Sequence, residues 1–77
     1  MRAKFEALVV SEVKKRNPEA KRTNYFLVQD GIPFRVSSEP ELEVGKRYRF
    51  DAVIFPDKTK AGYLVVLVDK AQKVEGV

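Results

Sequence analysis

The sequence contains no cysteine and no histidine. The chain therefore has no disulfides, and it lacks the usual zinc ligands, the commonest general base and a thiol nucleophile. It also has no glycine-rich motif of the kind that cradles phosphate. Its aspartates are scattered over expected turns and strand ends, and no two have a spacing typical of shared acid–base work: Asp30, Asp51, Asp57 and Asp69. We therefore expect a protein that is not an enzyme and that holds no cofactor and no metal.

Long apolar runs are also missing. The longest is YLVVLV, residues 63–68, which follows the charged stretch PDKTKAG. Because a helix needs roughly 20 apolar residues to cross a membrane, we interpret this run as a buried strand and expect no membrane partner. The N-terminus carries no signal-peptide cleavage pattern. With the absence of cysteine, this favours a cytoplasmic location.

The chain is short and its charge is concentrated in one segment. Its 77 residues predict a single domain, 1–77, with one core. The net charge is +4, and the stretch KKRNPEAKR, residues 14–22, carries five basic residues against Glu19, so this segment alone accounts for the whole net charge. Such a cluster is typical of a polyanion binder, but also of a solvated loop that keeps a small protein soluble.

The first apolar segment, KFEALVVSEVKK, predicts one long strand. Its β-branched valines and the lack of a helix cap favour strand over helix. The apolar parity changes near Val9, which predicts a bend or bulge there. Asn17-Pro18 ends the strand, because the proline ring removes a backbone donor and restricts the preceding residue.

The stretch TNYFLVQDGIPFRVSS predicts a tight β-hairpin. Asp30-Gly31 between two apolar runs indicates a two-residue turn, which fixes the register so that Gln29 faces Ile32 and Phe26 faces Arg35. Side chains alternate along each strand, so the two faces can be assigned. The more apolar face is expected to be the core: Tyr25, Leu27, Ile32, Phe34 and Val36. The other face is mixed: Asn24, Phe26, Val28, Arg35 and Ser37.

Phe26 and Arg35 are therefore expected to lie side by side on the outer face. An exposed ring beside a guanidinium is a surface on which a nucleobase can stack while the arginine contacts phosphate. The alternative is an ordinary cross-strand pair that only stabilises the sheet.

Two further strands follow. SSEPELEVGKRY has room for one helical turn or none, with Gly45 as a stop. GKRYRFDAVIFP alternates, which predicts Tyr48, Phe50, Ala52 and Ile54 inside and Arg47 and Arg49 outside. GYLVVLVDKAQKV is apolar on both faces, more than the interior of one small barrel requires. We therefore expect a second subunit to cover this strand in a homodimer.

This order of strands and loops resembles the five-stranded oligonucleotide/oligosaccharide-binding barrel, the OB-fold, over the whole chain. The resemblance lies in YFLVQDGIPFRV, ELEVGKRYRF and GYLVVLV, and it implies an all-β barrel with at most one short helical turn. An SH3-like barrel is the alternative. In OB-folds the ligand crosses the outer face of the second and third strands, between the loops that join strands one and two and strands four and five. These loops correspond here to residues 16–22 and 57–60.

The expected function is sequence-tolerant binding of single-stranded nucleic acid, with single-stranded DNA favoured. The residues expected to contact phosphate are Lys15, Arg16, Lys21, Arg22, Lys58 and Lys60. Phe26 would stack on a base, Arg35 would bridge ring and phosphate, and Tyr63 or Phe55 would add a second stacking site. Two alternatives remain open at this point. RNA binding uses the same residues, and a barrel that docks on a partner protein needs only the apolar strands.

Overall fold

The structure is a computed structural model that describes residues 1–14 and 18–74. These residues form five strands and no helix, so the predicted all-β class is confirmed. The strands are β1 (Arg2–Val13), β2 (Thr23–Gln29), β3 (Ile32–Ser38), β4 (Arg47–Pro56) and β5 (Leu64–Lys73). Within the described part of the chain there is accordingly no helix with the length and apolar character needed to cross a membrane.

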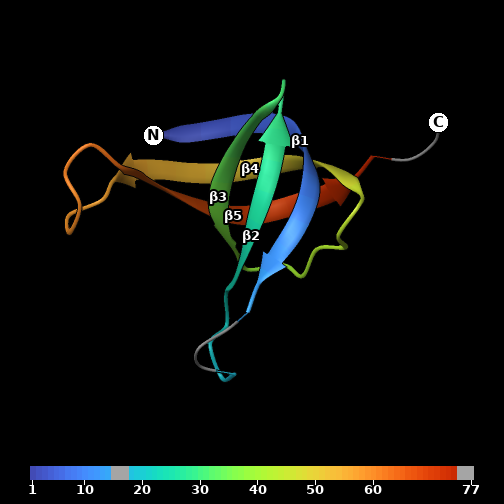
Figure 1. The fold of residues 1–77 in the computed structure, drawn as a ribbon, viewed down its shortest axis with the longest axis horizontal. Coiled ribbons are helices and arrows are strands. Elements are labelled where there is room, and N and C mark those ends of the chain that lie inside the picture. The colour runs from blue at the N-terminus through green and yellow to red at the C-terminus, as the bar shows by residue number, and fades with distance from the viewer. Residues whose placement is uncertain (15–17, 75–77) are drawn as a thin grey trace.

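The five strands close into a barrel in the order β1-β2-β3-β5-β4 (Figure 1). All neighbouring pairs are antiparallel except β3 and β5, which are parallel and pair only at Ser37–Leu67 and Ser38–Val68. This closed five-stranded barrel is compatible with an OB-like fold.

Strand β1 belongs to both halves of the barrel. Its first part, Arg2 to Leu8, pairs with β4, and its last part, from Leu8 to Val13, pairs with β2. The register with β2 shifts between Val9 and Ser11, which is the predicted bulge. A bulge adds one unpaired residue and bends the strand, so β1 can curve around the barrel, as Figure 1 shows.

The β2–β3 hairpin has the predicted register over its whole length, from Gln29–Ile32 at the turn to Thr23–Ser38 at the base. Asp30 and Gly31 have φ angles of 51° and 77°. This left-handed backbone is the conformation for which an Asp-Gly turn is suited. The sequence therefore determines which side chains share each face.

The core contains the inward-facing residues of all five strands. The fully buried apolar side chains include Val9, Tyr25, Leu27, Val36, Phe50 and Val68. Tyr48 and Ala52 are buried as predicted, and Ile54 is half-buried. The prediction for Ile32 was wrong: this side chain is 67% exposed, because the hairpin tip extends beyond the barrel and no strand lies over it.

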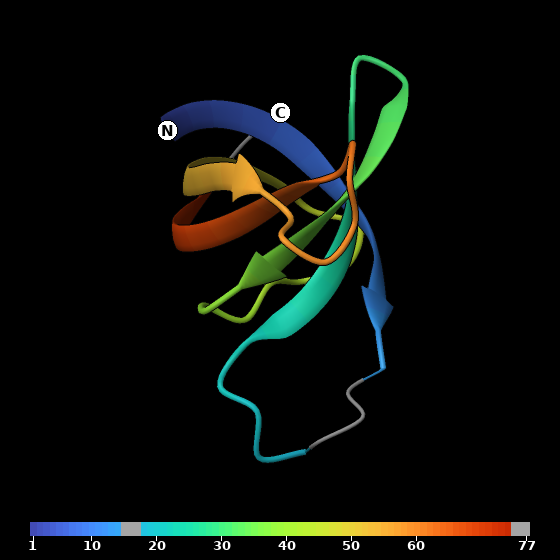
Figure 2. The same ribbon diagram turned by 90° about the vertical axis from the view of Figure 1, so that its left-hand side faces the viewer.

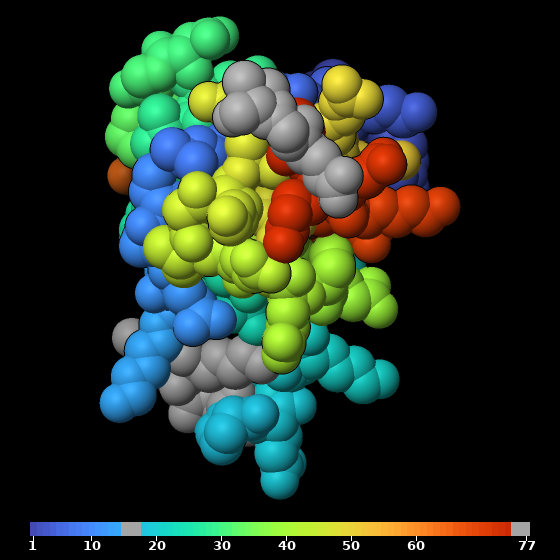
Figure 3. All heavy atoms as spheres, turned by 90° about the vertical axis from the view of Figure 1, so that its right-hand side faces the viewer, coloured from blue at the N-terminus to red at the C-terminus, as the bar shows by residue number. Residues whose placement is uncertain are grey.

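The connection between β3 and β4, residues 39–46, contains no helical turn and covers one end of the barrel (Figure 3). Leu42 is buried there, and its backbone N–H donates to the Tyr25 hydroxyl at 3.0 Å. The Glu43 N–H donates to the Tyr48 hydroxyl at 2.9 Å. These bonds satisfy backbone donors that no strand pairs, which is why an irregular segment can lie against the core.

Candidate nucleic-acid interface

Phe26 and Arg35 occupy the outer face of the β2–β3 hairpin as a directly opposed pair. The Phe26 side chain is 40% exposed, and Arg35 is also exposed. The Arg35 guanidinium forms no ion pair with any residue that the structure describes. An exposed ring therefore lies next to a cation whose donors are free of acidic partners in residues 1–14 and 18–74.

The β4–β5 loop, residues 57–63, is built around Asp57. The Asp57 carboxylate accepts hydrogen bonds from the Thr59 backbone N–H at 2.8 Å and from the Thr59 hydroxyl at 2.7 Å. These bonds, with a smaller contribution from the nearby Lys60 charge, lower the pKa of Asp57 below its ordinary value. Across the base of the loop the Asp57 N–H donates to the Tyr63 carbonyl at 3.0 Å. The charged loop thus has a defined shape.

This loop and the outer face of β3 enclose a groove of about 380 Å³, which we call the Arg35–Lys60 groove. It is lined by Asn24, Arg35, Val36, Ser37, Asp57, Lys60, Tyr63, Leu64, Val65 and Val66. The Lys60 ammonium lies 5.9 Å from the centre of the Tyr63 ring. Two cations and an exposed aromatic ring therefore share one hollow with a single carboxylate, that of Asp57.

The other predicted cations are placed differently. Lys58 and Lys21 are exposed, and neither lines the groove. Lys15 and Arg16 lie outside the described residues. Figure 2 shows the described part of the β1–β2 connection at the bottom of the barrel and the β4–β5 loop higher, in front of the strands. The two basic loops are therefore at separate places on the barrel.

Arg22 is engaged by the barrel itself. Its guanidinium donates to the backbone carbonyls of Ser37 and Val68, both at 3.3 Å, and lies 3.8 Å from the carboxylates of Glu39 and Asp69. Ser37 and Val68 belong to the short parallel contact of β3 and β5. Arg22 therefore spans the place where the barrel closes, which gives it a structural role whether or not it also contacts phosphate.

Two residues that line the groove were not predicted as site residues: Asn24 and Ser37. The alternation of the hairpin had already placed both on the outer face, so the sequence pattern contained the signal.

Of the two rings expected as a second stacking site, Tyr63 lines the groove and Phe55 does not. The sequence could not show which of these two rings faces the groove, because that depends on how the β4–β5 loop folds back.

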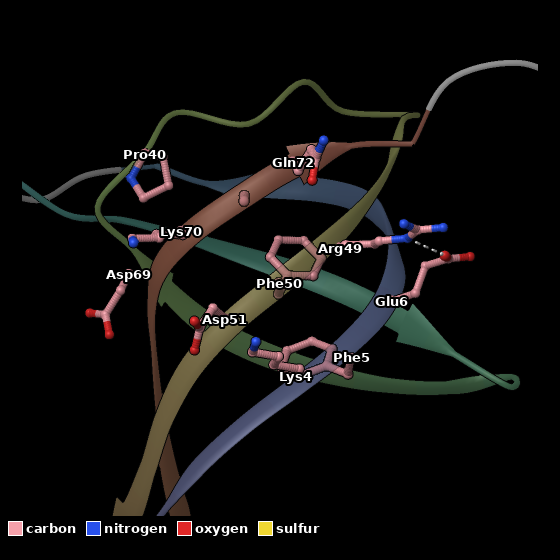
Figure 4. A pocket seen from close by; sticks show the side chains of 11 residues that line it. Lys4, Phe5, Glu6, Pro40, Arg49, Phe50, Asp51, Asp69, Lys70 and Gln72 are labelled. Carbon is pink, nitrogen blue, oxygen red and sulfur yellow. Dashed lines mark ion pairs between the residues drawn. The ribbon is translucent and has the colours of Figure 1, made fainter.

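A larger hollow of about 890 Å³ lies over β1, β4 and β5 (Figure 4). Its charges balance: Lys4, Arg49 and Lys70 against Glu6, Asp51 and Asp69. Most of them are also paired, since Arg49 lies 3.5 Å from Glu6, and Arg2 lies 2.7 Å from Asp51 and 3.2 Å from Asp69. As predicted, Arg49 is outside the barrel.

Within the part of the chain that the structure describes, no three histidine, cysteine, aspartate or glutamate side chains are grouped so that they could hold a metal ion. Comparison of the chain with protein-family models, with curated proteins and with solved structures found no match.

Proposed function

We propose that this protein binds single-stranded nucleic acid, with little dependence on sequence, along the outer face of β2 and β3. One observation carries the proposal: Arg35 of β3 and Lys60 of the β4–β5 loop line one groove, and Arg35 is the cross-strand partner of the exposed Phe26. Cations that track a backbone beside an aromatic ring are the features by which proteins bind single strands without reading their sequence.

In the proposed mechanism, cations bind the phosphates and aromatic rings stack on the bases. Arg35 and Lys60 neutralise phosphates and release counterions, with Lys21 and Lys58 as exposed cations nearer the periphery. Phe26 and Tyr63 offer flat apolar surfaces to the bases, and stacking on one aromatic is worth about 1 to 3 kcal/mol. Lys15, Arg16 and Arg22 remain predicted phosphate contacts. We favour DNA over RNA; contacts to the 2′-hydroxyl are what would distinguish the two.

The test is fluorescence anisotropy of a labelled oligo-dT and of its double-stranded counterpart, each titrated with the protein at two salt concentrations. We expect salt-sensitive binding to the single strand, and weaker binding of Arg35→Gln with a salt slope reduced by about 0.7. Arg49→Gln is the matched control, because it removes the same charge from an exposed arginine that is paired with Glu6. Equal effects of both substitutions, or no binding at low salt, would refute the proposal.

A second candidate function has its own observation. On the outer face of β4 and β5, Val53 opposes Leu67 and Phe55 opposes Val65; Phe55 is 38% exposed and the other three are half-buried. An apolar face of this kind favours docking of a second copy of the chain. Sedimentation velocity of the protein and of Phe55→Asp tests it. If the unmodified protein sediments as a dimer and Phe55→Asp as a monomer, this face is the dimer interface. If the unmodified protein is a monomer over the whole concentration range, this candidate function is refuted.

A further inference from the structure

Strands β3 and β5 pair over only a short part of their length. These strands pair only at Ser37–Leu67 and Ser38–Val68, and toward the start of each strand no further pairing joins them. An apolar slot of about 520 Å³ lies in this region. It is lined by Ala3, Phe5, Gln29, Phe34, Arg35, Ile54, Tyr63, Leu64 and Val66. The slot reaches the edge of the core, since Phe5, Phe34 and Val66 pack against the buried cluster.

The slot has the character of a site for a small, flat ligand. Its volume falls within the range of about 300 to 1,000 Å³ that is usual for such sites, and apolar side chains dominate its lining. Phe5 and Phe34 meet edge to face with ring centres 5.6 Å apart. Leu64, at the start of β5, is 65% exposed although it is a large apolar residue. An aromatic ring system would cover surface that the protein leaves open to water.

The slot adjoins the Arg35–Lys60 groove. Arg35, Tyr63, Leu64 and Val66 line both hollows. A ligand in the slot therefore lies next to Tyr63 and next to Arg35, whose guanidinium has no ion-pair partner in residues 1–14 and 18–74. An apolar slot that opens beside an unpaired cation is complementary to a flat ring that carries an anionic group, and a nucleotide has this chemistry.

We propose that the slot takes one base out of the strand that the groove binds, so that Arg35 holds a phosphate beside the inserted base. This inference rests on the function proposed above and deepens it. The slot then supplies a stacking site at the edge of the core, in addition to Phe26 and Tyr63 on the surface. A protein with few exposed rings thereby gains a further place to hold a base.

The experiment compares two probes of equal charge: a labelled oligo-dT of about 12 nucleotides, within the usual footprint of such a barrel, and the same backbone with abasic sites throughout. The slot variant is Ile54→Ala, because Ile54 is half-buried and lines the slot but not the Arg35–Lys60 groove. The control is Val44→Ala, since Val44 is 53% exposed and lies in the β3–β4 connection, at the other end of the barrel in Figure 1. Circular dichroism checks that both variants are folded.

We expect Ile54→Ala to bind oligo-dT about five- to tenfold more weakly and to bind the abasic strand like the unmodified protein. Val44→Ala should match the unmodified protein on both strands. A 2-aminopurine base within the oligo-dT should change its fluorescence on binding, and Ile54→Ala should abolish that change. If oligo-dT binds but Ile54→Ala has no effect, the base-insertion proposal is overturned, and an apolar segment of a protein partner becomes the candidate occupant of the slot. If neither strand binds, the proposed function itself fails.

Discussion

The hydroxyl of Tyr25 accepts a hydrogen bond from the backbone N–H of Leu42 at 3.0 Å, and both residues are buried. The bond joins the middle of the β2–β3 hairpin to the segment that covers the end of the barrel. Burial is the main cause that raises the pKa of Tyr25 above its ordinary value, so this phenol keeps its proton to a higher pH than an exposed tyrosine does. A single side-chain oxygen thus holds Leu42 in its place over the core.

Tyr25→Phe should lower the free energy of unfolding by about 1 to 3 kcal/mol, because it leaves the Leu42 N–H buried without an acceptor. Urea denaturation measures the loss. Tyr48→Phe is the comparison, since its partner Glu43 is exposed and its amide can turn to water. If Tyr25→Phe costs no more than Tyr48→Phe, then the Leu42 amide is not sealed from solvent.

Arg22→Gln should also destabilise the barrel, by about 1 to 3 kcal/mol, because the guanidinium bonds to carbonyls on both β3 and β5. Hydrogen exchange gives the local readout. The Glu39 amide donates to the Val68 carbonyl at 3.1 Å, and we expect it to exchange faster in the variant. Unchanged exchange and stability together with weaker oligo-dT binding would instead assign Arg22 to the phosphate contacts.

Gly31→Ala should cost about 1 to 2 kcal/mol, since Gly31 has a φ of 77° and a side chain is strained in the left-handed region. Nothing lies within 4 Å of the position that the new methyl group would take, so a clash does not contribute. Thermal or urea unfolding measures the change. A neutral result would mean that the turn adopts another conformation in solution.

Much of the fold was predictable because local signals fix it. The Asp30-Gly31 turn determines the register of β2 and β3, and the change of apolar parity near Val9 locates the bulge. Alternation predicted the burial of Tyr48, Phe50 and Ala52. Ile32 was misassigned because alternation says which face a side chain takes, but not how far the hairpin extends beyond its neighbours.

The candidate site was predictable only in part. The pairing of Phe26 with Arg35 followed from the hairpin register. That Lys60 lines a groove with Arg35, and that Arg22 turns toward Glu39 and Asp69, depends on contacts between segments distant in sequence. The sequence shows only that each of these residues is a cation. Which of them lines the groove and which forms ion pairs within the barrel depends on the folded contacts.

The order of the β4–β5 loop should depend on pH. Because the pKa of Asp57 is lowered in the folded loop, the ordering is fully present above the ordinary aspartate value of 3.8 and is lost as the pH falls through the lowered pKa. NMR titration of the Asp57 carboxyl carbon measures this midpoint. Thr59→Val removes the hydroxyl donor and should raise it. A midpoint that Thr59→Val leaves unchanged would show that the hydroxyl bond does not form.

Phe26→Ala should weaken oligo-dT binding by about 1 to 3 kcal/mol and leave the fold intact, because the ring is on the surface. Phe55→Ala is a close control: the two rings are 40% and 38% exposed and neither lines the groove, but only Phe26 is the cross-strand partner of Arg35. Equal losses would point to a general loss of apolar surface. A loss with Phe55→Ala alone would move the stacking site to β4.

The short parallel contact of β3 and β5 has a consequence for how the barrel forms and opens. Every other strand pair is antiparallel and more extensive, whereas this one joins only Ser37–Leu67 and Ser38–Val68. So few paired residues offset little of the loop entropy that the chain loses when the two strands meet, so we expect this contact to form last during folding. The same weakness makes it the first place to open in the native state, and such an opening would widen the slot at Leu64 while the antiparallel strands stay paired.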